Sequence, residues 1–132
     1  MKNIYLIQAS SLHITEMPLP YAAAAIEAYA LQNVEIRNNY KFEEIIFEKL
    51  KKQEILKKLE EPYLIGFSCY IWNYEYNLKM AEEIKKVFPK VKILFGGHSV
   101  PTNSTALLEK YKFIDYLIFG EGELAFTKIL VA

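Results

Sequence analysis

The sequence is poor in the residues and segments that mark secreted, thiolate-metal or membrane-spanning proteins. Its 132 residues include one cysteine, Cys69, so its own thiols can form neither a disulfide framework nor a cluster ligand set. No apolar run approaches the roughly 20 residues of a membrane-spanning helix. The apolar run at residues 4–7 is too short for a signal peptide. We therefore expect a protein of the reducing cytoplasm with no membrane partner.

The chain also lacks an excess of either charge. Lys and Arg total 16, and Asp and Glu total 16, so no net field attracts nucleic acid or an anionic membrane. Apolar side chains are abundant instead: hydrophobic residues make up 52% of the sequence, which is enough for one packed core at this length. We expect a single globular domain without a nucleic-acid partner.

Short apolar runs alternate with longer amphipathic ones along the chain. The apolar runs predict strands at residues 4–8, 34–38, 63–72, 91–95 and 114–119. The amphipathic stretches predict helices at residues 20–33, 42–61, 76–88, 104–112 and 123–131. Repeated strand–helix units predict a parallel sheet with helices on both faces. Five units of this size predict an α/β, flavodoxin-like, doubly wound five-stranded sheet with strand order 2-1-3-4-5.

Ligands of such sheets bind outside the carboxyl ends of the strands. Polar, glycine and aromatic residues gather in the loops that follow the predicted strands, whereas the opposite connections are short. A glycine lets a ligand approach the backbone closely, although it can equally serve the turn alone. Ser68 offers a hydroxyl at the end of the most buried strand, or it caps backbone there. The glycines at this edge are Gly96, Gly97, Gly120 and Gly122.

Residues 120–126, GEGELAF, fit the dinucleotide-binding fingerprint G-x-G-x-x-G/A after an apolar run. That fingerprint belongs on the first strand–helix turn, with an acid about twenty residues later that holds the ribose. Here it lies on the last predicted turn, so it does not predict a nicotinamide site. A flavin phosphate loop is also poorly matched, because residues 10–15 lack glycine and lie far from the next helix.

Several short matches, in order along the chain, carry a resemblance to a known family. The chain resembles the N-terminal cobalamin (B12)-binding domain of B12-dependent radical SAM enzymes over nearly its whole length, most closely from residue 63 onward. The resemblance implies a corrin held over the carboxyl face, with the nucleotide tail of cobalamin entering near the first and third strands. The matching residues are Gly66–Phe67–Ser68, Trp72–Asn73, Pro89, Gly96–Gly97, Asp115–Tyr116 and Gly120 to Glu123.

The resemblance also implies roles for individual residues. Ser68 resembles the serine that contacts the base of the tail. Gly96–Gly97 resembles the glycine pair that lets the tail pass. Tyr70 and Trp72 are candidates for walling the cavity, and the loop from Ser10 to Thr15 would lie near the lower face of the corrin. The full set of cofactor-binding candidates is Ser10, Ser11, His13, Ser68, Tyr70, Trp72, Gly96, Gly97, Gly120, Glu121 and Gly122.

The chain departs from related patterns in two places. Cobalamin mutases and methionine synthases carry D-x-H-x-x-G, whose histidine binds cobalt. Residues 11–16, SLHITE, keep His13 without the aspartate that would orient it, so the pattern does not predict a cobalt ligand. Radical SAM chemistry needs three cysteines for a 4Fe-4S cluster, and Cys69 is expected to be a buried hydrophobe. We expect residues 1–132 to be a non-catalytic fragment of a larger protein. Its C-terminal radical SAM barrel would hold the cluster and S-adenosylmethionine.

The leading hypothesis is a cobalamin-binding module that holds the corrin for methyl transfer or related radical chemistry. One alternative is a degenerate, cofactor-free α/β scaffold or substrate-recognition domain of a radical SAM protein. A flavin-binding, flavodoxin-like protein is a second and weaker alternative. An isolated fragment would also expose the surface that faces its partner domain, which could drive self-association.

Overall fold

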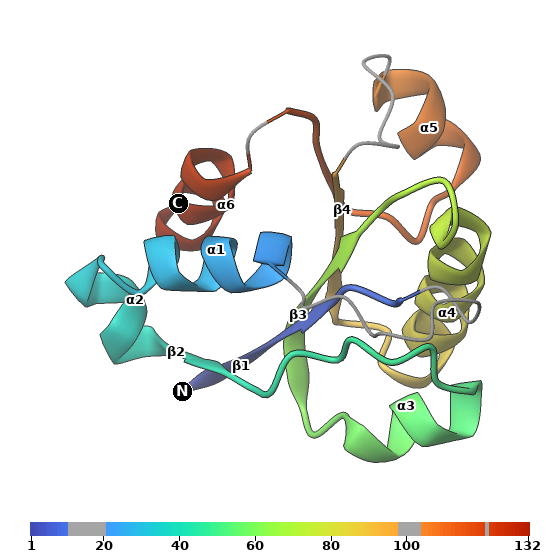
Figure 1. Cartoon of the computed structure of the whole chain (residues 1–132), viewed down its shortest axis with the longest axis horizontal. Helices are drawn as coiled ribbons and strands as arrows, with labels where there is room; N and C mark the ends of the chain where they lie inside the picture. The colour runs from blue at the N-terminus through green and yellow to red at the C-terminus, as the bar shows by residue number, and fades with distance from the viewer. Residues whose placement is uncertain (11–20, 98–103, 121) are drawn as a thin grey trace.

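The computed structural model describes residues 1–10, 21–97, 104–120 and 122–132. Its centre is a five-stranded, all-parallel sheet with helices on both faces (Figure 1). The strand order β2-β1-β3-β4-β5 confirms the predicted fold class and topology. The order reverses between β1 and β3, which is where ligands of such sheets bind. The strands are β1 (Lys2–Ile7), β2 (Tyr40–Phe42), β3 (Pro62–Ser68), β4 (Lys92–Gly96) and β5 (Tyr116–Ile118).

The alternation of side chains along each strand supplies two apolar faces. Even-numbered apolar strand residues pack with α1, α2 and α6, and the odd-numbered ones, apart from Tyr63 at the start of β3, pack with α3 and α4. Helices α1 and α6 lie side by side over one face (Figure 1). In the described part of the chain, no helix combines the length and the apolarity that crossing a membrane requires. The helices are α1 (Tyr21–Ala30), α2 (Val34–Asn39), α3 (Lys52–Lys58), α4 (Tyr74–Val87), α5 (Ser104–Lys110) and α6 (Glu123–Val131).

The strand predicted at residues 34–38 is wrong, because this segment is helix α2. The side-chain oxygen of Asn33 accepts a hydrogen bond from the Ile36 amide at 3.2 Å and so caps the helix start. Of the two apolar residues that suggested a strand, Ile36 is fully buried and Val34 is 58% exposed. A five-residue alternation fits one turn of helix as well as a short strand. The second strand, β2, begins only at Tyr40.

The single helix predicted at residues 42–61 is also wrong in its first half. Residues 43–51 run alongside the end of β1, where Ile46 forms a parallel bridge with Ile7. The Ile46 carbonyl accepts a hydrogen bond from the Gln8 amide at 2.9 Å, and the Ile46 amide donates one to the Leu6 carbonyl at 3.0 Å. Pairing with the strand edge thus outweighs the local helical pattern. Only α3, from Lys52, is helical here.

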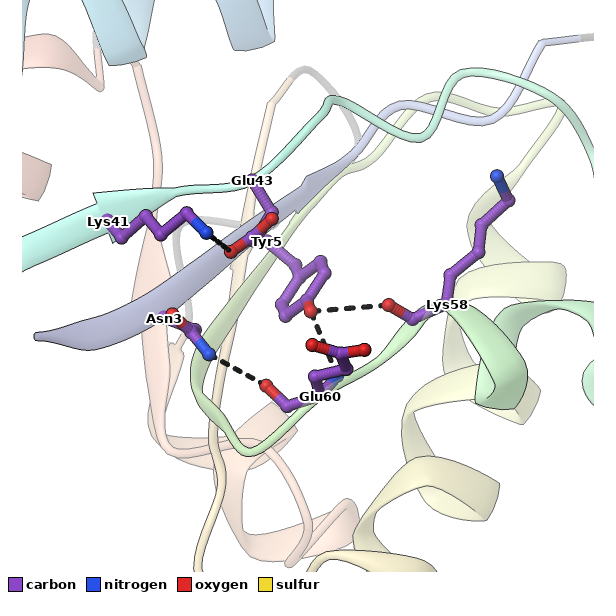
Figure 2. A network of polar contacts seen from close by, with 6 residues as sticks. All are labelled: Asn3, Tyr5, Lys41, Glu43, Lys58 and Glu60. Carbon is purple, nitrogen blue, oxygen red and sulfur yellow. Dashed lines mark hydrogen bonds and ion pairs between the residues drawn. The ribbon is translucent and has the colours of Figure 1, made fainter.

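A polar network fixes the connection between α3 and β3 to β1 (Figure 2). The Tyr5 hydroxyl donates a hydrogen bond to the Lys58 carbonyl at 3.2 Å and accepts one from the Glu60 amide at 2.9 Å. The Asn3 side-chain amide donates to the Glu60 carbonyl at 2.8 Å. These contacts satisfy backbone groups at the end of α3 and hold β3 beside β1.

Candidate functional site

A cavity of about 670 Å³ lies between one face of the sheet and the helices α1 and α6. Its floor consists of two rows of even-numbered strand residues in register. The row at the carboxyl edge is Ser68, Gly96 and Ile118, and the row behind it is Leu6, Gly66 and Leu94. The helices contribute Ala22, Ala23 and Ile26 from α1, and Glu123 and Phe126 from α6, which Gly122 precedes.

The cavity exists because side chains are missing where a strand would normally carry them. A Cβ atom on Gly66 would lie 3.0 Å from Cδ2 of Leu6, so the neighbouring side chain already leans over this glycine. Among the described residues, a Cβ atom on Gly96 would meet nothing closer than 3.6 Å, the distance to the Ile118 carbonyl oxygen. A branched residue, of the kind that strands favour, would fill the space above Gly96. Glycine at position 96 therefore leaves room for a ligand, whereas the space above Gly66 is taken by the Leu6 side chain.

Two other glycines serve the backbone. Gly97 has φ +110°, and a Cβ atom there would lie 2.7 Å from the carbonyl oxygen of Cys69. The same turn brings the Cys69 amide within 2.6 Å of the Gly96 carbonyl oxygen. Gly120 has φ +79°, again a left-handed conformation that favours glycine. Of the glycines for which the sequence left two interpretations open, Gly97 and Gly120 have backbone conformations that favour glycine, and Gly96 leaves space.

The side chain of Asn73 holds the carboxyl ends of two strands together. Its nitrogen donates to the Ala9 carbonyl at 3.1 Å and to the Ser68 carbonyl at 3.0 Å, while its oxygen accepts from the Tyr70 amide at 2.7 Å. Asn77, one turn further along α4, also donates to the Ser68 carbonyl, at 3.2 Å. Both asparagines are buried. They fix the rim of the cavity at the point where the strand order reverses.

The sequence interpretation missed this role, although a signal was present. In the sequence, Asn73 stands out only as part of the Trp–Asn match. Asn77 lies on the same stripe of α4 as Ala81 and Ile84, which are buried. A polar side chain on a buried stripe needs a partner inside the protein, and that requirement points to a link with the strand ends.

The Cys69 side chain packs in the core and is not a nucleophile. Burial raises the pKa of its thiol to about 12, although a hydrogen bond from Asn77 to the sulfur, at 3.4 Å, acts in the opposite direction. The thiol is therefore neutral at physiological pH. Among the described residues, no group of three or more His, Cys, Asp or Glu side chains is placed to hold a metal ion.

Tyr70 and Trp72 form a stacked pair in the loop after β3. Their ring centroids are 4.6 Å apart and their planes differ by 1°. Tyr70 lines the cavity, whereas Trp72 is 55% exposed and does not line it. Ile71 between them is 92% exposed. This loop therefore presents an apolar surface beside the mouth of the cavity.

The structure brings six of the sequence candidates together around the cavity: Ser68, Tyr70, Gly96, Gly97, Gly120 and Gly122. Ser10 follows β1, where its amide donates to the Phe47 carbonyl at 3.0 Å, and it does not line the cavity. Ser11, His13 and Glu121 lie outside the described residues.

Asp115, from the Asp–Tyr match, lies just before β5 at the opposite end of the sheet from the cavity. It accepts hydrogen bonds from the Ile93 amide at 2.9 Å and from the Lys85 ammonium at 2.8 Å. Its role is to join α4, β4 and β5.

The comparisons with known proteins agree with one another. The family model of the B12 binding domain matches residues 11–130. The chain is 36% identical over 118 residues to the cobalamin-dependent radical SAM methyltransferase TokK of Streptomyces tokunonensis. It is 31% identical over 113 residues to the 2-(S-pantetheinyl)-carbapenam-3-carboxylate methyltransferase of Streptantibioticus cattleyicolor. These alignments cover 89% and 86% of this chain but only 17% of each relative's length.

A solved structure supports the fold. A pilus assembly-related protein from Burkholderia pseudomallei superposes with a TM-score of 0.53 over 97% of this chain and 90% of its own. The two sequences are 11% identical, so the likeness bears on the α/β architecture alone.

Proposed function

The chain belongs to the B12-binding domain family, and from that premise we propose that it is the cobalamin-binding module of a B12-dependent radical SAM enzyme. In this proposal it holds the corrin for methyl transfer, or for related radical chemistry, that a separate domain carries out. The observation that carries the proposal is the cavity between the carboxyl half of the sheet and the helices α1 and α6.

The residues around the cavity fit the nucleotide tail of cobalamin. The tail is a ribose phosphate that carries a flat, mostly apolar benzimidazole base. The volume of about 670 Å³ lies within the roughly 300–1,000 Å³ of typical ligand pockets, which are mainly apolar with a few polar groups. Leu6, Leu94 and Phe126 supply apolar walls, and Ser68 supplies a hydroxyl at the edge.

Each group on this face then has a defined task. Ser68 would donate a hydrogen bond to a nitrogen of the base. Gly96 and Gly97 would let the tail pass close to the backbone, with Gly120 and Gly122 forming the opposite rim. Ser10, Ser11 and His13 would lie near the lower face of the corrin, as the family resemblance implies. Tyr70, Trp72 and Glu121 complete the set of cofactor-binding residues in this proposal.

The protein's own residues bind and orient the cofactor and exclude water from the tail. When bound, cobalamin supplies a cobalt centre that carries the methyl group. We propose that a radical SAM barrel works with this domain and provides the 4Fe-4S cluster and S-adenosylmethionine. Two findings support this proposal: the TokK relative is a cobalamin-dependent radical SAM methyltransferase, and the chain matches only a small share of each relative. A cytoplasmic location remains a prediction from the single cysteine.

A titration of the chain with hydroxocobalamin tests the proposal. We expect the visible spectrum of the corrin to change to saturation at one cofactor per chain, and colour to co-elute with protein on gel filtration. A parallel titration with flavin mononucleotide should give no co-elution. If neither ligand co-elutes, the proposal fails in favour of a cofactor-free scaffold.

A further inference from the structure

The polar side chains of the cavity lie at one end of it. The polar side chains among its described lining residues are Ser68, Tyr70 and Glu123. All three come from the carboxyl edge, since Ser68 ends β3, Tyr70 follows it, and Glu123 begins α6. One row and one helical turn further in, the lining is aliphatic and aromatic: Leu6, Ile26, Leu94 and Phe126.

The backbone of this inner part is already paired. Gly66 lies in register between Leu6 and Leu94, so its peptide groups belong to the hydrogen-bonded ladder of the central strands. Ile26 and Phe126 lie inside helices, and the Phe126 amide donates to the Gly122 carbonyl at 2.8 Å. Among the described residues, the inner walls thus offer a ligand methyl groups and an aromatic ring.

Such a wall distinguishes between cofactors that differ only in the base of the tail. The six-membered ring of dimethylbenzimidazole carries two methyl groups and no polar atom. The corresponding ring of adenine carries two nitrogens and an amino group, which lose their hydrogen bonds to water when buried here. Hydrophobic pockets reject an added polar group by up to about 100-fold.

Building on the proposed function, we propose that the inner cavity formed by Leu6, Ile26, Leu94 and Phe126 selects cobamides by their base. It accepts dimethylbenzimidazole and disfavours adenine. The imidazole part, which both bases share, stays near Ser68 at the edge. Glycine at position 96 adds no side chain to the floor, which leaves space for a flat ring.

The test compares three corrinoids on the unmodified chain, with dissociation constants from visible absorption and equilibrium dialysis. The ligands are hydroxocobalamin, the hydroxo form of its adenine analogue pseudocobalamin, and cobinamide, which lacks the base. We expect the adenine analogue to bind at least about tenfold more weakly than hydroxocobalamin. Equal affinity for these two overturns the selection while leaving the proposed function intact. Absence of binding by all three overturns the proposed function itself.

A pair of variants then tests whether the inner cavity is the part of the protein that discriminates between the two bases. Ile26→Gln places an amide, both donor and acceptor, in the inner cavity, and we expect the affinity ratio between the two cofactors to fall towards one. Ile129→Gln is the matched control, because Ile129 is also a partly buried helical isoleucine of the same core cluster but does not line the cavity. Its ratio should equal that of the unmodified chain. An unchanged ratio in a folded Ile26→Gln variant contradicts the assignment, and the three-ligand comparison stands whether or not the variants fold.

Discussion

The side-chain nitrogen of Asn73 lies 3.1 Å from the carbonyl oxygen of Ala9, across 64 residues of sequence. The same nitrogen lies 3.0 Å from the Ser68 carbonyl oxygen. One amide therefore links the ends of β1 and β3, the two strands between which ligands of this fold bind. Because Asn73 is 1% exposed, water cannot replace these bonds if the amide is lost.

Replacing Asn73 with aspartate should be strongly destabilising. The substitution keeps the shape but removes both donated hydrogen bonds and places a buried carboxylate beside two carbonyl oxygens. We expect the free energy of unfolding to fall by about 2–3 kcal/mol, measured by urea denaturation at neutral pH.

Asn33→Asp is the matched control for this substitution. The Asn33 side chain only accepts a hydrogen bond, at the start of α2, and aspartate caps a helix as well as asparagine does. Its unfolding free energy should stay within about 0.5 kcal/mol of the unmodified chain. Equal losses in the two variants would show that the link between β1 and β3 is not what stabilises this edge.

Gly97→Ala and Gly120→Ala separate backbone strain from steric conflict. Both glycines have positive φ, but a Cβ atom on Gly97 would lie 2.7 Å from the Cys69 carbonyl oxygen, whereas one on Gly120 would meet no atom of the described residues within 4 Å. Gly120→Ala should cost about 1–2 kcal/mol, the penalty of a left-handed conformation. Gly97→Ala should cost clearly more, because the backbone must also move. Thermal unfolding of both variants measures the difference, and similar losses would mean that the turn adapts without cost.

The overall topology could be predicted because both faces of the sheet are covered. Central strands buried on two faces give unbroken apolar runs, as at residues 63–68, and these are unambiguous in sequence. The edge strand β2 has three residues, and the segment beside β1 at residues 43–47 pairs through its backbone. Backbone pairing leaves little trace in the pattern of side chains, so both segments were misassigned.

The sequence could predict which edge of the sheet carries a cavity, because glycines gather at the strand ends there. Six of the candidates line that cavity, and their role in binding stays a prediction. The residues that line the cavity from the helices, such as Ile26 and Phe126, could not be distinguished from ordinary core residues. An apolar stripe on a helix has the same sequence pattern whether it faces a strand or a cavity. Asn73 was missed because its partners, Ala9 and Ser68, meet it only in three dimensions.

Filling the cavity should abolish cofactor binding without unfolding the protein. In Gly96→Val the new Cβ atom meets only ordinary contacts, the nearest at 3.6 Å, and the methyl groups extend into the cavity. Valine suits a strand better than glycine does, so the melting temperature should not fall. We expect affinity for hydroxocobalamin to drop at least about tenfold, because a buried methylene or two is worth that much.

Lys92→Val controls for the change of residue type on the same strand. Lys92 is exposed at the opposite end of β4 and does not line the cavity. Its affinity for hydroxocobalamin should be unchanged. Tight binding by a folded Gly96→Val variant would place the tail of the cofactor elsewhere.

Tyr76 should make stability depend on alkaline pH. Its hydroxyl donates a hydrogen bond to the Leu50 carbonyl at 2.6 Å, and burial raises its pKa from 10.0 to about 12. The unfolded chain therefore loses this proton near pH 10, while the folded chain keeps it until about pH 12. The stabilisation is complete below pH 10 and is lost as the pH rises towards 12.

We therefore expect Tyr76→Phe to cost about 1 kcal/mol of unfolding free energy at neutral pH, the value of a typical hydrogen bond. Above pH 10 the variant should lose stability less steeply than the unmodified chain, so the two urea midpoints converge. Cys69, whose pKa is also raised, remains in both proteins and contributes equally. Tyr21→Phe alters a tyrosine that is 73% exposed, and its curve should follow that of the unmodified chain. Parallel curves for Tyr76→Phe and the unmodified chain across this range would show that the Tyr76 hydroxyl ionises equally in the folded and unfolded states.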